Sequence, residues 1–353
     1  MKITRRWASG MLAILFLATA SAVAGESGRS VFVLTSTNDP SGNDLVVFQL
    51  NATGKRSLSL VSMLPTGGNG GAGGNAGILQ FKYDLGAVAN YGSNTVSQIV
   101  RQDDSISIWS TINLPKGCMN PDSVALTVSH LFVVGSTCAE SHEWPSGNVD
   151  ATVNLTDATA AQIAVGNTWA AVTFTSGSLF QLPLAKDGAL SGTSTAIPLP
   201  AEANNTPLGE AFWGDLLGFT PAHSADNFAV VQNRHVYPVA FPNPPGPYPN
   251  NAPCWVAKGP GNVWYTGNSP GHAISIFFSD GQGGAFYKSR PLPGVPTDIT
   301  VSADGKWLAV IYSAGGDAYV AVFSIDTYGD LSLVATSSPI SGVAAFSGVA
   351  ISQ

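Results

Sequence analysis

Charged side chains are scarce in this sequence. Of its 353 residues, 15 are Lys or Arg and 22 are Asp or Glu, so 10% of the chain is charged and the net charge at pH 7 is −7. Binding to nucleic acid needs clustered basic residues, so we do not expect such a partner. Long apolar runs are missing as well. The run at residues 11–20 is far shorter than the roughly 20 residues that cross a bilayer, so we expect no membrane span.

The N-terminus has the order of features typical of a secretory signal. Three basic residues precede the apolar run and small residues follow it at 22–24, so cleavage is expected after Ala24. We therefore predict a signal peptide at residues 1–24 and a secreted or periplasmic protein. The Sec route and the twin-arginine route both remain open. Removal of this segment leaves 12 basic and 22 acidic residues, a net charge of −10.

Cysteine is rare too, with three residues in the chain. They lack the paired spacing of a zinc site, so we expect no metal. In an oxidising compartment, Cys118 and Cys138 are the predicted disulfide pair, because they flank two consecutive strands that run out and back. Cys254 would then be free. The Gly-rich segment 67–77 lacks the Lys-Ser or Lys-Thr of a phosphate-binding loop and begins no helix, so we expect no nucleotide or other cofactor.

Glycine and proline are, in contrast, abundant, at 39 and 23 residues, which favours short strands joined by tight turns over helices. The clearest pattern lies at residues 297–336, where turns such as 302–306 and 328–330 separate four short strands. Four antiparallel strands in about 45 residues form one blade of a β-propeller, which must stack on neighbours to bury its faces. Weaker versions of this unit occur at residues 78–112, 122–155, 161–196, 210–241 and 253–287.

Residues 25–353 are therefore predicted to form a single all-β domain, a seven-bladed β-propeller with 47 residues per blade. The first blade lacks an innermost strand, because residues 30–35, 44–50 and 58–63 match its second, third and fourth strands. The C-terminal segment 342–352 supplies the missing strand. Closure of the ring by both chain ends removes free sheet edges, which favours a propeller over an open solenoid.

Several segments of the last repeat resemble the blade motifs of the seven-bladed lactonase family, which includes phosphogluconolactonases and carboxymuconate cyclases. They are Pro-Thr-Asp at 296–298, SADGKWLAV at 302–310, VAVFSID at 320–326 and Gly-Asp-Leu at 329–331. The resemblance covers essentially the whole mature chain and implies lactone hydrolysis or lactonizing cyclisation, although such motifs specify architecture more than chemistry. Basic residues hold the anionic substrates of that family, and they are sparse here. A neutral or singly charged lactone or sugar acid therefore fits this sequence better.

In a propeller, the loops that lead into the innermost strands and those between second and third strands lie on one face, around the central channel. We expect the functional site there. Three of the five histidines are assigned to this face, His142, His235 and His272. His142 is the sharpest catalytic candidate, because Glu143 beside it could orient the imidazole and the predicted disulfide would brace their loop. For each histidine, a solvated or hydrogen-bonded loop residue is the alternative.

Further candidates come from the fifth blade and from the tryptophans. Glu210 precedes an irregular aromatic segment and is predicted to be a second acid or base, and Arg234 is predicted to hold a substrate carboxylate. Trp213 and Trp255 would form an aromatic floor for a ring substrate, with packing between blades as the alternative.

The leading hypothesis is that His142, Glu210, Arg234 and His235 converge on one channel mouth and act on a small lactone or sugar acid, with a histidine moving the proton. The rival hypothesis is a non-catalytic exported propeller whose same face binds a polysaccharide or a protein. A lyase that acts on uronic acid polymers is a third alternative, for which the sequence has no decisive motif. In each case we expect a monomer.

Overall fold

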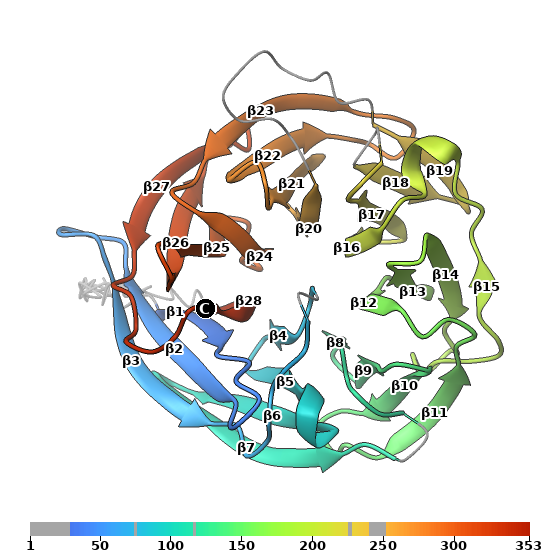
Figure 1. The fold of residues 1–353 in the computed structure, drawn as a ribbon, viewed down its shortest axis with the longest axis horizontal. Coiled ribbons are helices and arrows are strands. Elements are labelled where there is room, and N and C mark those ends of the chain that lie inside the picture. The colour runs from blue at the N-terminus through green and yellow to red at the C-terminus, as the bar shows by residue number, and fades with distance from the viewer. Residues whose placement is uncertain (1–28, 74–75, 116–117, 225–227, 240–251) are drawn as a thin grey trace, which may run out of the picture.

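The computed structural model describes residues 29–73, 76–115, 118–224, 228–239 and 252–353. The predicted signal peptide lies outside these residues. Within them the chain forms seven four-stranded antiparallel sheets, arranged as blades around a central axis (Figure 1). The helices of the described part are two short 3₁₀ turns, η1 (Tyr91–Ser93) and η2 (Ala201–Ala203). No helix in these ranges has the length and apolar character needed to cross a membrane.

Strands follow one another from the axis outward in every blade. Blade 1 contains β28 (Ser347–Ser352), β1 (Val31–Ser36), β2 (Asp44–Asn51) and β3 (Ser57–Pro65), and blade 2 contains β4 (Leu79–Lys82), β5 (Leu85–Asn90), β6 (Thr95–Gln102) and β7 (Ser105–Asn113). Blade 3 contains β8 (Ser123–Leu126), β9 (His130–Val134), β10 (Cys138–Glu143) and β11 (Val149–Asn154), and blade 4 contains β12 (Ala160–Val165), β13 (Trp169–Phe174), β14 (Ser178–Pro183) and β15 (Thr195–Ala196). Blade 5 contains β16 (Pro207–Trp213), β17 (Leu216–Pro221), β18 (Ala229–Gln232) and β19 (His235–Pro238), and blade 6 contains β20 (Pro253–Lys258), β21 (Val263–Asn268), β22 (Ala273–Phe278) and β23 (Ala285–Pro291). Blade 7 contains β24 (Val295–Val301), β25 (Trp307–Ala314), β26 (Asp317–Ile325) and β27 (Leu331–Thr336).

The ring closes in blade 1 with strands from both ends of the chain. The C-terminal strand β28 pairs antiparallel with β1, so that Val33 lies opposite Ile351 and Thr35 opposite Val349. It occupies the innermost place of the sheet, next to the axis (Figure 1). The prediction of a seven-bladed propeller closed in the first blade is therefore confirmed.

Each blade is buried on both of its faces, because it stacks between two neighbours. In β25, Leu308 and Val310 pack in the apolar cluster shared with blade 6, whereas Ala309 and Ile311 pack in the cluster shared with blade 1. Successive side chains of a strand point to opposite faces, so a strand between two apolar interfaces is apolar throughout. This explains why the second strands of the blades show continuous apolar runs.

We call the face of the ring at which the innermost strands begin the top face, and the face at which they end the bottom face. Because neighbouring strands are antiparallel, the connection between second and third strands also lies on the top face. The connections between first and second strands, and between third and fourth strands, lie on the bottom face.

Side-chain hydroxyls near the top face join five consecutive blades of the ring. Each hydroxyl donates to a backbone carbonyl of the following blade, and together these bonds connect blades 4, 5, 6, 7 and 1. They run from Thr173 to Leu208 (2.6 Å), from Thr220 to Cys254 (3.2 Å), from Ser269 to Pro296 (3.2 Å) and from Thr297 to Phe346 (3.1 Å). The innermost strands are thus fixed relative to one another, which fixes the walls of the central channel.

Candidate functional site

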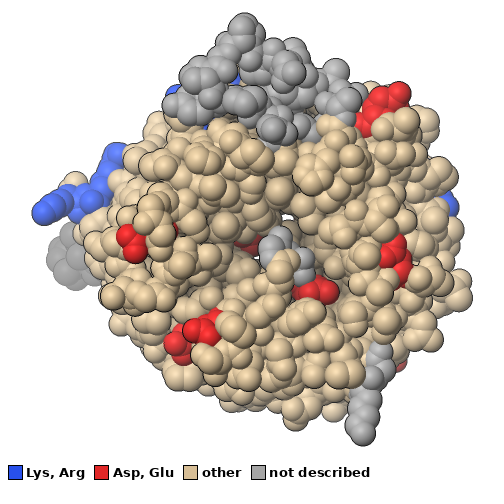
Figure 2. Space-filling model, in the orientation of Figure 1, with Lys and Arg blue, Asp and Glu red and all other residues tan. Residues whose placement is uncertain are grey.

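The innermost strands enclose a cavity of about 260 Å³ on the axis of the ring. Residues from the innermost strands of all seven blades line it. Figure 2 shows the central opening of the ring, with acidic atoms close beside it and basic atoms only toward the rim of this view. Among the described residues, two carboxylic acids line the cavity, Glu210 and Asp298.

Glu210 is a buried acid whose carboxyl group makes no good hydrogen bond. It lies in β16, is 2% exposed, and neither carboxylate oxygen has a partner of acceptable geometry among the residues that the structure describes. Burial raises the pKa of Glu210 well above its ordinary value, and the nearby backbone N–H of Ala164 offsets only part of this effect. A carboxyl with a pKa raised by burial is a stronger base than an ordinary carboxylate, which suits it to proton exchange with a ligand.

The backbone of Glu210 is held firmly, unlike its carboxyl group. The side-chain oxygen of Gln162 accepts from the N–H of Glu210 at 2.7 Å, and the side-chain nitrogen donates to its carbonyl oxygen at 2.9 Å. These bonds join β12 to β16, where the pairing of β16 with β17 shifts register between Pro207 and Glu210. Gln162 therefore fixes the position from which the Glu210 side chain enters the cavity.

Asp298 is the second acid of the cavity, and its carboxylate is occupied. It accepts from the N–H of Ile299 at 2.8 Å, and also from the backbone N–H groups of Val349 and Gly77. These partners belong to blade 7, blade 1 and the segment that leads into blade 2. Burial raises the pKa of Asp298 to about 7, against the opposing effect of the three N–H groups. Asp298 thus joins blades at the axis.

Toward the bottom face, the cavity continues into a funnel of about 880 Å³. Cavity and funnel share the lining residues Gln80, Leu126, Phe212, Lys258, Thr300 and Val301. Arg29, Lys82 and Lys258 are the cations that line the funnel within the described ranges. Arg29 lies 2.5 Å from Asp84, whereas Lys82 has no ion pair with any residue that the structure describes. The funnel is also lined by Asp84 and Asp304, which are paired with Arg29 and Lys306, so a ligand that enters from the bottom face passes charges of both signs before it reaches the two cavity acids.

Lys258 at the junction of cavity and funnel is half-buried. Its ammonium donates to the carbonyl oxygens of Gly259 and Gly261, the latter at 2.6 Å, and lies 4.6 Å from the ring centre of Trp213. Burial lowers the pKa of Lys258 to about 8. Trp213, a predicted substrate contact, is 48% exposed at the bottom end of β16 and covers this ammonium. It does not line the cavity.

Trp255, the other predicted aromatic contact, lies on the top side. It is 5% exposed, and its indole Nε1 has no hydrogen-bond partner among the described residues. It lines a separate groove of about 710 Å³ together with Ala72 and Cys254, and this groove shares no lining residue with the central cavity. Cys254 is a free thiol, as predicted.

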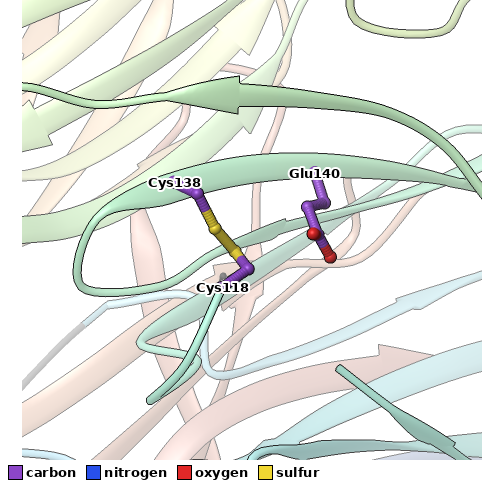
Figure 3. A group of neighbouring side chains, drawn as sticks. All are labelled: Cys118, Cys138 and Glu140. Carbon is purple, nitrogen blue, oxygen red and sulfur yellow. A yellow bond between two sulfur atoms is a disulfide. The ribbon is translucent and has the colours of Figure 1, made fainter. Parts of the chain in front are cut away.

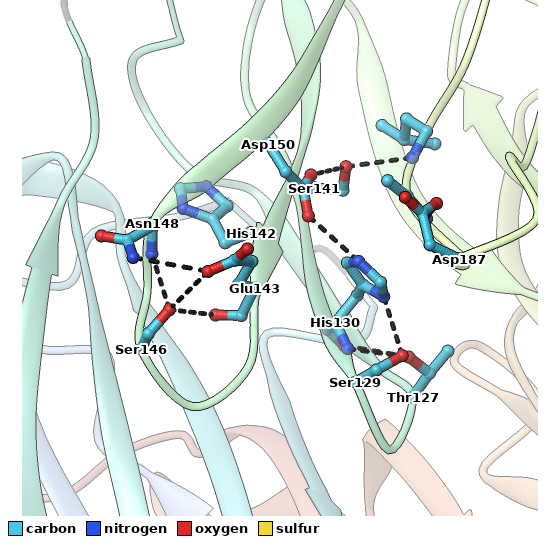
Figure 4. Close-up of polar contacts among 12 residues, drawn as sticks. Thr127, Ser129, His130, Ser141, His142, Glu143, Ser146, Asn148, Asp150 and Asp187 are labelled. Atoms are coloured by element: carbon cyan, nitrogen blue, oxygen red, sulfur yellow. Dashed lines mark hydrogen bonds and ion pairs between the residues drawn. The ribbon is translucent and has the colours of Figure 1, made fainter.

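His142 and Glu143 do not lie where the sequence analysis placed them. We expected a loop on the top face, but both residues end the third strand, β10, beside the bottom face. His142 is fully buried, with Nε2 at 3.2 Å from a carboxylate oxygen of Glu140 and Nδ1 at 3.1 Å from the carbonyl oxygen of Gly147. Glu143 is exposed and accepts from Ser146, so it does not orient the imidazole (Figure 4).

The predicted disulfide between Cys118 and Cys138 is confirmed, with a Cα–Cα distance of 5.3 Å. It lies at the top end of β10, opposite to the end that carries His142, so it does not brace that residue. Glu140 lies beside it (Figure 3), and one ligand atom of each of these three residues falls within 4.8 Å of the others. Both thiols are engaged in the disulfide, so this group does not offer thiolates to a metal.

Arg234 and His235 lie at the outer edge of the bottom face. Arg234 occupies the turn between β18 and β19, and its guanidinium donates to the carbonyl oxygen of Ala196 in blade 4 at 3.0 Å. His235 is exposed at the start of β19. His272 is on the top face, as expected, in the turn between β21 and β22, but it is exposed and does not line the cavity.

The predicted convergence of four side chains is therefore wrong. Glu210 lines the cavity, whereas His142 is inside blade 3 and Arg234 and His235 are at the rim. The error lies in the assignment of strands: turns that we placed between second and third strands follow the third strand. Because strands alternate in direction, a shift by one strand moves a turn to the opposite face of the ring.

No protein-family model matches the sequence, and no curated protein matches it. Solved structures are similar in fold. A putative 6-phosphogluconolactonase from Bacteroides fragilis is 12% identical with a TM-score of 0.66, over 93% of this chain and 99% of that chain. A protein from Lactobacillus plantarum is 13% identical with a TM-score of 0.66, over 92% of this chain and 100% of that chain. The periplasmic gluconolactonase of Pseudomonas aeruginosa is 13% identical with a TM-score of 0.62, over 92% and 99%. At these identities the likeness shows a shared propeller fold.

Proposed function

We propose that this protein is a hydrolase of small lactones, with the central cavity as its active site and Glu210 as its general base. The observation that carries the proposal is the state of the Glu210 carboxyl group. It is buried, it lines the cavity, and within the described part of the chain neither of its oxygens has a good hydrogen-bond partner. A buried polar group without partners is costly to a fold, so its retention favours a role with a ligand.

In the proposed reaction, the Glu210 carboxylate takes a proton from a water molecule while the water oxygen bonds to the carbonyl carbon of the lactone. The ring C–O bond then breaks, and the leaving ring oxygen receives the proton from Glu210. The product is a hydroxy acid, and the carboxylate is regenerated. A raised pKa makes Glu210 a stronger base than an ordinary carboxylate, which suits this step.

Substrate charge follows from the distribution of ionic groups along the channel. In the funnel, Asp84 and Asp304 are paired with Arg29 and Lys306, which leaves Lys82 and Lys258 to attract one negative charge. Glu210 and Asp298 disfavour a second one in the cavity. A neutral or singly charged lactone fits both conditions. Support for a lactone also comes from the fold, because the similar Pseudomonas aeruginosa protein is a periplasmic gluconolactonase.

The test is the variant Glu210→Gln, which keeps the size of the side chain and removes the base. With glucono-δ-lactone and a set of uncharged γ- and δ-lactones, kcat/KM should fall roughly 10²-fold or more, with the Tm unchanged. Glu143→Gln, which alters an exposed carboxylate on the bottom face, is the matched control and should retain full activity. A wild-type protein that turns over none of these lactones would overturn the proposal and favour a binding propeller.

The pH profile gives an independent check of the proposed role. As a general base, Glu210 works in its charged form, so kcat/KM should rise with pH through the raised pKa of Glu210. A profile that falls over the same range would contradict the base role and assign Glu210 as an acid.

A further inference from the structure

A second group of reactive side chains lies on the bottom face of blade 3, outside the central cavity (Figure 4). Ser129 Oγ lies 2.9 Å from His130 Nδ1. On the other side of the same ring, His130 Nε2 lies 3.0 Å from Asp150 Oδ2. Contact between a serine, a histidine and an aspartate in this order is the arrangement that activates a hydroxyl as a nucleophile.

A bulge in the sheet brings Asp150 to this group. The pairing of β10 with β11 shifts register between Ser141 and His142, which leaves Asp150 without a partner on β10. In an uninterrupted ladder, Asp150 would face the same side of the sheet as His142, because side chains alternate between the sides. The extra residue turns its carboxylate to the other side, where Ser141 and His130 lie.

The imidazole and the carboxylate are both fixed by their surroundings. Ser141 Oγ donates to Asp150 Oδ1, and the backbone N–H of Leu190 in blade 4 donates to Ser141 Oγ at 3.0 Å. The side chain of His130 is only 7% exposed, and its ring lies 6.1 Å from that of Phe132. With the Nε2 proton directed to Asp150, the imidazole presents an acceptor nitrogen, Nδ1, to the hydroxyl of Ser129.

Ser129 is an exposed residue in the turn between β8 and β9. Across from it, Gly188 of blade 4 leaves space: a Cβ there would lie 3.2 Å from His130 Nδ1 and 3.6 Å from Ser129 Oγ. Gly188 also has φ +100°, a conformation that favours glycine, so this space stays free of a side chain.

We propose that Ser129 is the nucleophile of a second site that transfers small acyl groups from neutral or cationic esters, with His130 as its base and Asp150 as a positioning residue. The preference for neutral or cationic esters follows from the acidic side chains around Ser129. Besides Asp150, the carboxylates of Glu143 and Asp187 lie in this part of the bottom face (Figure 4). Together they repel an anionic ester.

In the first step of the proposed reaction, Ser129 Oγ bonds to the carbonyl carbon of the ester and gives its proton to His130 Nδ1. The ester C–O bond breaks, and the alcohol leaves with the proton from His130, which gives an acyl-serine and neutral imidazole. Water, with His130 again as the base, then hydrolyses the acyl-serine to the free acid.

Diisopropyl fluorophosphate tests the nucleophile directly. In this reaction the P–F bond breaks as Ser129 Oγ bonds to phosphorus, and the proton of the hydroxyl passes to His130. Mass spectrometry of the mature protein should find the adduct on Ser129, formed at least about 10²-fold faster than on Ser146. Ser146 is an exposed serine of the same blade face, and it has no hydrogen bond to a histidine among the described residues. Equal labelling of the two serines would overturn the proposal.

Variants separate this site from the central cavity and from a structural role. Ser129→Ala should abolish the labelling, and Glu210→Gln should leave it unchanged, so failure of one proposal does not affect the other. Asp150→Asn should lower kcat for p-nitrophenyl acetate by about 10²-fold or more while KM and Tm change little. A loss of labelling in Asp150→Asn that occurs only with a lowered Tm would assign the group a structural role and overturn the proposal.

Discussion

The two carboxyl groups of the central cavity hold similar positions and differ in what surrounds them. Each follows a register shift in an innermost strand, Glu210 in β16 and Asp298 in β24. Three backbone N–H groups from different parts of the ring bind Asp298, whereas neither oxygen of Glu210 has a good partner among the described residues. Burial alone therefore does not distinguish the two acids. Asp298 connects blades, and the Glu210 carboxyl makes no such connection within the described ranges.

Of the effects expected from these two acids, the change of the unfolding free energy with pH should be the largest. Burial raises the pKa of Asp298 to about 7, so the folded state holds a proton that the unfolded state has released. The resulting stability is fully present below the ordinary pKa, near 4, and is lost as pH rises through 7. The free energy of unfolding should fall by up to about 4 kcal/mol over this range, at roughly 1.4 kcal/mol per pKa unit.

Urea unfolding between pH 4 and 8 measures this slope. Asp298→Asn should remove most of the slope below pH 7, and Glu210→Gln should remove the part that extends through its own raised pKa. An unchanged slope in Asp298→Asn would show that other groups cause it.

Removal of the Asp298 side chain should have the next largest effect, and it should distinguish the two acids by their contributions to the unfolding free energy. At pH 5, Asp298→Ala leaves the buried N–H groups of Val349 and Gly77 without their acceptor, which should cost about 3 kcal/mol of unfolding free energy. Glu210→Gln should change it by less than about 1 kcal/mol, because no good hydrogen bond is lost. Equal losses in the two variants would contradict the distinction between a connecting and a free acid.

A variant of Gln162 tests whether the hydrogen bonds that hold the Glu210 backbone also position its side chain. Gln162→Ala leaves the N–H and C=O of Glu210 unpaired and should cost about 2 kcal/mol of unfolding free energy. Because the proposed base then loses its fixed position, lactone turnover should also fall, by about tenfold. Full activity in this variant would show that the bonds serve the ring alone.

The fold could be predicted from the sequence because it repeats. The turn at 302–306 and the apolar strands on either side of it identify a blade, and the orphan strand near the C-terminus identifies the closure. The sequence does not show where a strand ends within a blade. Residues 138–143 are one strand, yet their polar composition suggested a loop at His142, which moved that residue to the wrong face.

The site was harder to predict, because the decisive features depend on contacts between blades. Glu210 was identified as a candidate from its aromatic neighbours, but Asp298 was read as part of a blade motif, and Gln162 carried no signal. The group of Ser129, His130 and Asp150 was missed for a related reason. Its aspartate reaches the histidine through a bulge, and a bulge is not visible in the alternation of side chains along the sequence.

The smallest effect is expected where blades are joined at the rim instead of the axis. Asp330 of blade 7 accepts from Lys288 and Arg290 of blade 6, at 2.6 Å in each case, which holds the pKa of Asp330 at about 2. A carboxyl with a lowered folded-state pKa stabilises the fold above its ordinary pKa, near 4, and this contribution is lost as pH falls toward 2. Because the three side chains are 27 to 38% exposed, solvent screens both ion pairs, and Asp330→Asn should lower the unfolding free energy by less than about 1 kcal/mol at pH 7.

Urea unfolding in dilute buffer and in about 1 M salt should show that this cost shrinks with salt. The cost of Asp298→Ala should stay constant, since the Asp298 carboxyl is buried and its partners are uncharged N–H groups. A cost for Asp330→Asn as large as that for Asp298→Ala, or one that salt leaves unchanged, would show that the rim connects these blades as firmly as the axis does.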